Sequence, residues 1–181
     1  TKDGGAYEKS SFLSYKYKDG SWTETVESRR VGHPAFSKDG KIMHLGGRYK
    51  ERTETGWSET KTLDAPLNDG EGKFVMRLTA ADNGTIYYDT FSKDDPAFPI
   101  RYSRLIDGKY ETPKALGPAV NTGMQLNHPF IAPDESYLLW DAKREDGYGN
   151  SDIYISFKQD DGSWGNAVNL GDKINTDAWE A

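Results

Sequence analysis

The chain has 181 residues with a formal net charge of −6, no cysteine, 29% charged residues and 13% aromatic residues. The acidic balance argues against a nucleic-acid partner, because sites for a phosphate backbone need clustered lysine and arginine. No apolar run approaches the roughly 18 residues of a membrane-spanning helix, and the absence of cysteine excludes disulfides and thiolate metal sites. Aromatic stretches punctuated by 19 glycines and by Asp-Gly pairs favour an all-β fold.

The first predicted element is a hairpin near the N-terminus, and its pattern recurs along the chain. Residues 9–22 read KSSFLSYKYKDGSW, an alternating strand, a tight Asp-Gly turn and a Ser-Trp pair that opens a second strand. The pattern returns as IRYSRLIDGKY at 100–110 and as SDIYISFKQDDGSW at 151–164, with a degraded copy that ends at Trp57. Asp-Gly accepts the positive φ values that a two-residue turn between twisted strands requires, so these copies predict β-hairpins.

Two further blocks repeat between the hairpins. The block that opens each unit is an apolar segment, a turn and a strand, and it reads HPAFSKDGKIMHL from His33, MRLTAADNGTIYY from Met76 and HPFIAPDESYLLW from His128. The block that follows each hairpin turn aligns without gaps, at spacings of 53 and 54 residues, over 63–69, 116–122 and 170–176. Each unit therefore contains four short antiparallel strands, a to d, over about 40 to 50 residues, which is typical of a propeller blade.

We therefore predict an all-β fold, a β-propeller of four-stranded antiparallel blades, with about three and a half blades in this chain. Such a propeller is truncated or incomplete. A single propeller domain, 1–181, divides into a half blade with strands c and d at 1–32 and blades at 33–70, 71–127 and 128–181, the last with a linker to a missing strand a. Because an open inner edge invites strand pairing, we expect self-association through the open propeller edges.

The units resemble the PD40, or WD40-like, β-propeller repeat of TolB-like proteins. The best copies of its motifs are Ala132-Pro133-Asp134-Glu135, Asp152-Ile153-Tyr154-Ile155-Ser156, Asp161-Gly162-Ser163-Trp164 and the segment 170–176. The resemblance covers nearly the whole chain, and its motifs are scaffold residues, so it is specific for the fold and weak for the function. It implies a periplasmic, extracellular or cell-envelope location and a protein or carbohydrate ligand.

The candidate catalytic residues are two histidines and two aspartates at equivalent repeat positions. His33 and His128 each precede a proline at the start of strand a, the innermost strand, where they could bind a metal or polarise a substrate in the channel. The alternative for both is a structural hydrogen bond of the imidazole. For His44, on strand b, we expect a purely structural role. Asp89 and Asp141 end strand b in successive units and could approach each other as an acid/base pair.

The most polar loop, residues 141–152, supplies the remaining candidates. Asp146, Asn150 and Asp152 offer hard oxygen ligands for Ca²⁺, although the loop lacks the EF-hand pattern and a solvated turn is the alternative. No other cofactor is expected. The basic and aromatic residues that we predict to contact a ligand are Arg77, Lys143, Arg144 and Trp179.

The function that these features favour is a non-catalytic propeller scaffold for protein or glycan binding. One alternative is a polysaccharide-active enzyme, a lyase or glycosidase, that uses channel-facing histidines. Another is an accessory propeller of a larger envelope protein or peptidase. An enzyme is the less favoured class because no nucleophile elbow, phosphate loop or thiol nucleophile is present.

Overall fold

A computed structural model of the chain describes residues 12–27, 34–63, 67, 74–91 and 99–181. Every regular element among these residues is a β-strand. The chain divides into two compact units, residues 1–33 and residues 34–181. In the described part of the chain, no helix is long and apolar enough to cross a membrane.

The first unit contains the N-terminal hairpin that the sequence predicts. Strand β1 (Phe12–Lys18) pairs antiparallel with β2 (Ser21–Glu27). Asp19 and Gly20 form the turn with φ values of 52° and 81°. Two consecutive positive φ values define the type I′ turn, whose twist matches that of the flanking strands.

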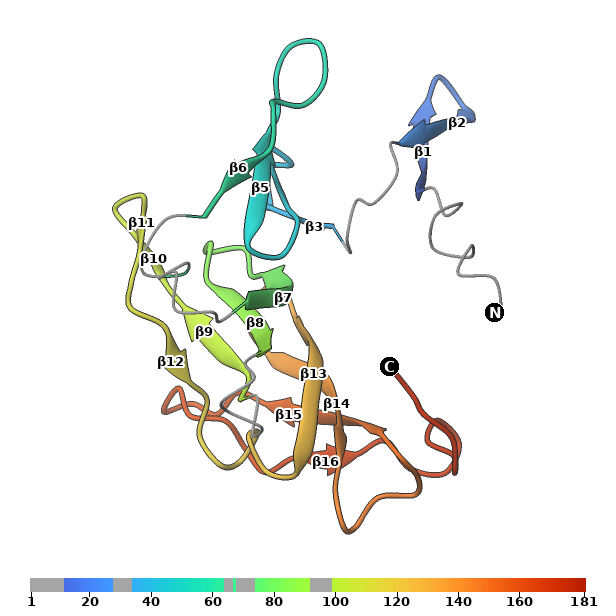
Figure 1. The fold of residues 1–181 in the computed structure, drawn as a ribbon, viewed down its shortest axis with the longest axis vertical. Coiled ribbons are helices and arrows are strands. Elements are labelled where there is room, and N and C mark those ends of the chain that lie inside the picture. The colour runs from blue at the N-terminus through green and yellow to red at the C-terminus, as the bar shows by residue number, and fades with distance from the viewer. Residues whose placement is uncertain (1–11, 28–33, 64–66, 68–73, 92–98) are drawn as a thin grey trace. The chain divides into compact units, whose positions relative to one another are not determined.

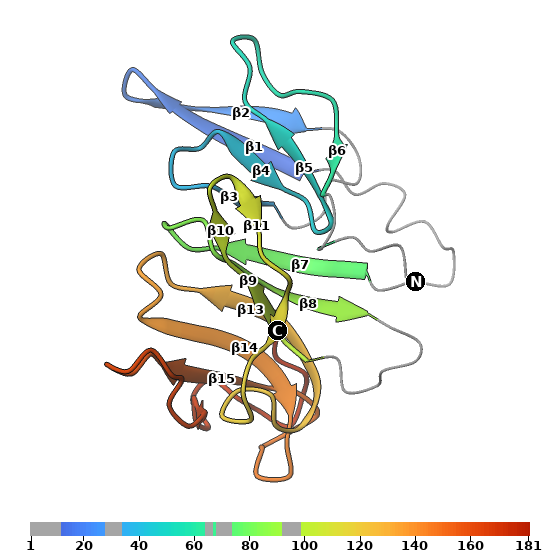
Figure 2. The same ribbon diagram turned by 90° about the vertical axis from the view of Figure 1, so that its left-hand side faces the viewer.

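Residues 34–181 form three four-stranded antiparallel sheets, which we call blades 1, 2 and 3 (Figure 1; Figure 2). Blade 1 contains β3 (Ala35–Phe36), β4 (Ile42–His44), β5 (Arg48–Glu51) and β6 (Lys61–Thr62). Blade 2 contains β7 (Phe74–Ala80), β8 (Ile86–Phe91), β9 (Arg101–Ser103) and β12 (Lys114–Ala115). Blade 3 contains β13 (Met124–Ile131), β14 (Tyr137–Lys143), β15 (Asp152–Phe157) and β16 (Val168–Asn169). In each blade the strands lie side by side in chain order, which is the a-to-d order of a propeller blade.

The hairpin turns between strands c and d differ between blades 2 and 3. In blade 2, β10 (Leu105–Ile106) and β11 (Lys109–Tyr110) pair as a small separate sheet around Asp107 and Gly108, whose φ values are 49° and 75°. In blade 3 only Gly162 has a positive φ, 82°, because the loop contains one more residue. That geometry is a type I turn followed by a left-handed glycine, so the Asp-Gly pair there does not form the two-residue turn that the sequence predicts.

Two apolar clusters hold the blades of the second unit together. One contains Ile100, Leu116 and Val120 of blade 2 with Leu138, Trp140 and Tyr154 of blade 3. The other joins blades 1 and 2 through residues that include Leu63, Leu67, Leu78, Ile86 and Tyr88. A sheet that packs against neighbours on both faces needs apolar side chains on both faces. The sequence predicts strand b from this pattern.

In blades 2 and 3, the block that follows the hairpin turn is bonded to the backbone of strand c. The Asn121 side chain accepts the N–H of Ile100 and donates to its carbonyl, at 2.9 and 3.0 Å. Asn175 forms the same pair of bonds with Ile153, at 2.8 and 3.0 Å. The Asn of this motif therefore fastens the linker to strand c in both blades, which is a structural role.

These blades are those of a β-propeller. Hydrogen bonds also cross between neighbouring blades: the Thr79 hydroxyl donates to the Pro129 carbonyl and accepts the N–H of Ile131, both at 3.1 Å. Trp164 packs edge-on against Tyr87 of the preceding blade, with ring centroids 6.1 Å apart. The recurrent aromatic after the hairpin turn therefore packs between blades here.

Candidate functional site

His128 lies on an irregular stretch of β13 in blade 3. The register of β13 on β14 shifts between Met124 and Asn127 and again between Asn127 and Phe130. The φ angle of His128 is 52°, although the residue is not glycine and precedes Pro129. A positive φ is uncommon for such a residue, and residues before proline favour extended backbone. Strained backbone of this kind clusters at functional sites, so His128 is a candidate on conformational grounds.

The imidazole of His128 is oriented by Asp141. Nδ1 lies 2.5 Å from Oδ1 of Asp141, which is 2% exposed at the end of β14. The other carboxylate oxygen accepts the hydroxyl of Ser151 at 3.0 Å. A carboxylate at Nδ1 fixes the ring orientation and the tautomer, so Nε2 is the nitrogen that a ligand or substrate would meet. The His128 side chain is 26% exposed, which leaves the ring accessible.

Asp89 meets the same residue from blade 2. Its carboxylate accepts the backbone N–H of Arg77 at 2.7 Å and the backbone N–H of His128 at 2.9 Å. Burial raises the pKa of Asp89, and the two backbone donors oppose that rise. The structure therefore brings Asp89 and Asp141 to one residue, where Asp89 holds the backbone and Asp141 holds the side chain. His33 lies outside the described residues.

The arrangement is that of an oriented histidine and differs from a nucleophile–base pair. Ser151 is fully buried and bonds to the carboxylate of Asp141. In a serine nucleophile site the hydroxyl of the nucleophile bonds to the imidazole instead. The geometry thus supports an imidazole that binds or exchanges a proton at Nε2, with Ser151 in a supporting position.

Of the predicted calcium ligands, Asp146 and Asn150 lie in the loop that follows β14, and Asp152 is the first residue of β15. Asp152 is buried, and its carboxylate accepts the N–H groups of Tyr148 and Gly149 and the amide of Asn169, at 2.7, 3.1 and 2.7 Å. The Asp146 side chain is 78% exposed, and Asn150 is exposed. Among the described residues, no three acidic or histidine side chains are grouped to hold a metal ion. Calcium binding stays a prediction.

The same loop and the segments that contact it carry several predicted ligand contacts, and we call residues 143–151 with Met124 and Trp179 the loop surface. Arg144 lies 4.9 Å above the Tyr154 ring, with its side chain 15% exposed. Residues 122–124 and 143–146 line a hollow of about 610 Å³. Trp179, 57% exposed, bridges to Ser151. Arg77 is half-buried on β7, where its backbone N–H binds Asp89.

Two exposed side chains of the loop surface are not predicted from the sequence. Met124 is 60% exposed and Tyr148 is 53% exposed. Tyr148 follows the Asp-Gly pair of the loop. An aromatic residue in a polar loop has no packing role in the repeat, and this feature of the sequence could have identified Tyr148 as a contact residue. Hydrogen bonds from Asn150 to the Ala178 carbonyl and from Glu180 to the Ser151 carbonyl, both 3.0 Å, fasten the loop to the segment that contains Trp179.

No protein-family model matches the chain, and no curated protein sequence matches it either. Solved structures that it resembles include TolB from Acinetobacter baumannii, at 13% identity and a TM-score of 0.49 over 93% of this chain and 42% of that one. They also include a luciferin-regenerating enzyme, at 11% identity and a TM-score of 0.45 over 85% and 50% of the two chains. A third is a protein assigned as a 6-phosphogluconolactonase from Bacteroides uniformis, at 17% identity and a TM-score of 0.43 over 92% and 49%. The chain spans half the length or less of each of these structures.

Proposed function

We propose that this chain is a non-catalytic β-propeller scaffold that binds a protein or glycan ligand through the loop surface of blade 3. The observation that carries the proposal is the contrast between its buried carboxylates and its exposed large side chains. The buried carboxylates of Asp89, Asp141 and Asp152 already accept backbone or side-chain donors of the scaffold. The large side chains of Met124, Tyr148 and Trp179 are more than half exposed.

Exposed aromatic side chains on a fixed loop are suited to binding. Aromatic residues, with arginine, supply most of the energy of many interfaces, because they bury a large area at a small cost in side-chain entropy. The loop surface adds an exposed lysine, Lys143, and the partly covered Arg144. The PD40-like motifs support a protein or carbohydrate ligand and a location in the cell envelope, and we include both in the proposal.

The test is a binding screen followed by paired substitutions. The purified chain is screened on an array of cell-envelope polysaccharides and peptides, and the affinity for any bound species is measured by titration. We expect Trp179→Ala to weaken binding by at least about tenfold, as for an exposed aromatic anchor. The matched control is Phe157→Ala, a side chain 51% exposed in the same blade. Phe157 ends β15, about 17 Å along the strand from Asp152, which adjoins the loop surface. Removal of the Phe157 ring should therefore leave binding unchanged.

The polysaccharide-active enzyme is the competing candidate, and the oriented imidazole of His128 favours it. An imidazole held by a carboxylate at Nδ1 is suited to general base catalysis at Nε2. The same array measures this outcome through the release of new chain ends from each polysaccharide. Cleavage that is lost in His128→Asn, with the fold retained, would contradict the non-catalytic proposal.

A further inference from the structure

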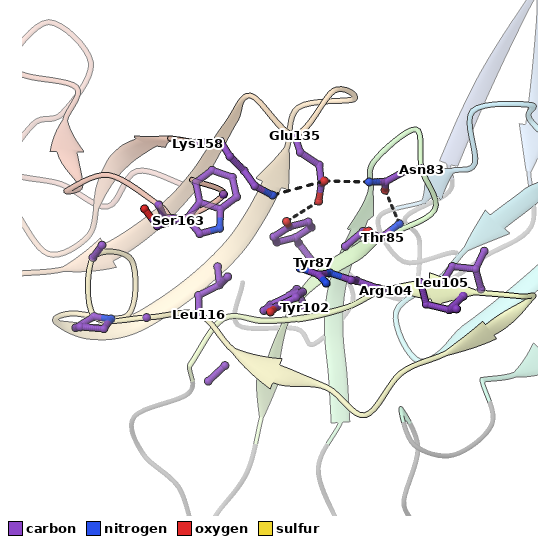
Figure 3. A pocket seen from close by; sticks show the side chains of 17 residues that line it. Asn83, Thr85, Tyr87, Tyr102, Arg104, Leu105, Leu116, Glu135, Lys158 and Ser163 are labelled. Carbon is purple, nitrogen blue, oxygen red and sulfur yellow. Dashed lines mark hydrogen bonds and ion pairs between the residues drawn. The ribbon is translucent and has the colours of Figure 1, made fainter. Parts of the chain in front are cut away.

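A groove lies between blades 2 and 3 (Figure 3), and its lining includes neither His128 nor a residue of the loop surface. Its volume is about 700 Å³, within the range of roughly 300 to 1,000 Å³ of small-molecule sites. Tyr87, Tyr102 and Arg104 come from blade 2, and Glu135, Lys158 and Trp164 come from blade 3. The segment 115–119, with the buried Leu116, completes the lining.

The polar centre of the groove is Glu135, which links the two blades. Its Oε1 accepts the hydroxyl of Tyr87 at 2.7 Å, and its Oε2 accepts the Asn83 amide at 2.9 Å. Lys158 approaches Oε2 at 3.6 Å, and Figure 3 shows these contacts converging on one carboxylate. Burial and the adjacent Glu135 raise the pKa of Tyr87, so its hydroxyl stays a donor. The carboxylate is therefore already satisfied by scaffold donors.

Two cations line the same groove. Arg104 is exposed, lies 5.9 Å from the centre of the Tyr102 ring, and has no acidic partner among the described residues. Lys158 is 28% exposed and lies 5.2 Å above the Trp164 ring. With Glu135 as their counter-ion, Arg104 and Lys158 leave the groove with one excess positive charge, on a chain whose net charge is −6. An anion entering the groove would meet the guanidinium of Arg104, which pairs with no carboxylate among the described residues, and the ammonium of Lys158, which it would share with Glu135.

The repeat provides an internal comparison for this groove. A groove of about 650 Å³ occurs one blade earlier, lined by His44, Tyr49, Glu51, Leu63, Leu105 and Tyr110. The strand pairings place Tyr49 and Tyr110 where the first groove has Tyr102 and Trp164. These aromatic positions recur, so they belong to the scaffold.

The charged positions do not recur. The same pairings place Glu51 at the position of Arg104 and Leu105 at the position of Lys158. Glu51 is also paired with Lys61 at 2.6 Å. The earlier groove has a lysine at another position, Lys109. The combination of two cations at the positions of Arg104 and Lys158 is thus specific to the groove between blades 2 and 3, and blade packing does not require it.

We propose that this groove binds a small molecule with a carboxylate on a flat or apolar body. The carboxylate lies against Arg104 and Lys158, and the body lies on Tyr102 and Leu116. Arginine presents a planar pair of donors that matches a carboxylate, and the aromatic lining suits a flat partner. Either an aromatic acid or a sugar acid has this chemistry. The site is separate from the loop surface, so its ligand is independent of the proposed function.

The test titrates the full chain with phenylacetate and with glucuronate, and with phenylacetamide and glucose as uncharged controls. We expect one of the two acids to bind with a dissociation constant below about 10 mM, which is the weak limit for a small site, and its uncharged control to bind at least tenfold more weakly. Arg104→Gln and Lys158→Gln should each weaken binding of the acid by about tenfold. Lys109→Gln, an exposed lysine on β11 outside this groove, should not change it.

Each outcome decides the proposal. Binding of phenylacetate identifies an aromatic body and binding of glucuronate identifies a sugar body, and both support it. The proposal is overturned if neither acid binds, if the uncharged control binds equally well, or if Arg104→Gln binds like the unsubstituted chain. Thermal melts of all three variants confirm that each is folded. We expect all three to fold, because the Arg104 and Lys109 side chains are exposed and Gln is similar in length to the Lys158 side chain that it replaces.

Discussion

His44 illustrates how a single polar residue in this fold depends on burial. It lies on β4 and is 3% exposed, and its Nδ1 has no hydrogen-bond partner among the described residues. Burial lowers its pKa from 6.5 to about 4, because the charged ring would lose its hydration. His44 is therefore neutral in the folded chain at pH 7, which fits the structural role that the sequence predicts for it.

We predict that His44 makes the stability of the fold depend on pH. Between pH 6.5 and about 4 the unfolded histidine binds a proton that the folded one does not, so the free energy of unfolding falls as the pH is lowered through this range. From pH 7.5 to 4.5 we expect a loss of about 2 to 3 kcal/mol that is absent in His44→Leu. Urea denaturation of both proteins at the two pH values measures it.

The comparison with His44→Leu removes the contributions of other groups. The raised pKa of Asp89 acts in the opposite direction, since the folded state then holds a proton that the unfolded state releases. That contribution is common to both proteins and cancels in the difference. Parallel pH dependences for the two proteins would show that His44 is not buried as neutral imidazole.

The sequence predicts which repeat positions the residues of the His128 site occupy, but it does not predict the contacts between them. Repetition alone predicts His128 at the start of strand a, but β13 begins four residues earlier, at Met124. Repetition also predicts Asp89 and Asp141 near the end of strand b, where they lie. Their bonds depend on the bulge in β13 and on the offset between blades 2 and 3, and side-chain packing sets both. For the same reason the groove around Glu135 is not apparent from the sequence, because its residues come from two blades.

At the scale of elements, glycines decide where one blade can approach the next. Gly46 and Gly40 both have left-handed backbone, with φ values of 63° and 65°. A Cβ on Gly46 would lie 2.8 Å from the Met76 carbonyl oxygen and 2.9 Å from that of Val75, both on β7 of the next blade. A Cβ on Gly40 would meet nothing within 4 Å. The two glycines thus have the same backbone conformation, but only Gly40 has room for a Cβ.

We predict that Gly46→Ala destabilises the fold more than Gly40→Ala does. Left-handed backbone costs a residue with a Cβ roughly 1 to 2 kcal/mol, and both variants lose this amount. Gly46→Ala must also displace β7 from blade 1, so we expect an additional loss of about 1 to 3 kcal/mol. Thermal or urea unfolding of the two variants and the unsubstituted chain measures the difference. Equal losses would mean that blades 1 and 2 do not approach closely at Gly46.

Element types and order are the part of the structure that the sequence predicts best. Asp-Gly turns, apolar strand-b segments and the Asn-containing linker each carry a local signal, and each appears where the repeat places it. The turn at Gly162 differs because one extra residue changes the turn type. Short strands such as β5, between Gly46 and Thr55, carry too few residues for a period of two to identify them.

At the scale of the whole molecule, the unit of residues 34–181 is held together by contacts between neighbouring blades. Both apolar clusters lie within it, and each joins two consecutive blades. In repeat architectures the stability is approximately the sum of single repeats and of the interfaces between nearest neighbours. Self-association through open edges stays a prediction, since it concerns contacts beyond a single chain.

We predict that a chain of residues 34–181 alone folds, because it retains both clusters. It should show a β-sheet circular dichroism spectrum and a cooperative urea transition. The control is residues 34–123, which lack blade 3 and therefore Trp140 and Tyr154 of the first cluster, and which leave Ile100 and Val120 uncovered. We expect this shorter chain to lose cooperative unfolding, since deleting one blade removes a whole interface. If 34–181 also unfolds without a cooperative transition, contacts with residues 1–33 must be part of the folding unit, and nearest-neighbour packing within the three blades is insufficient.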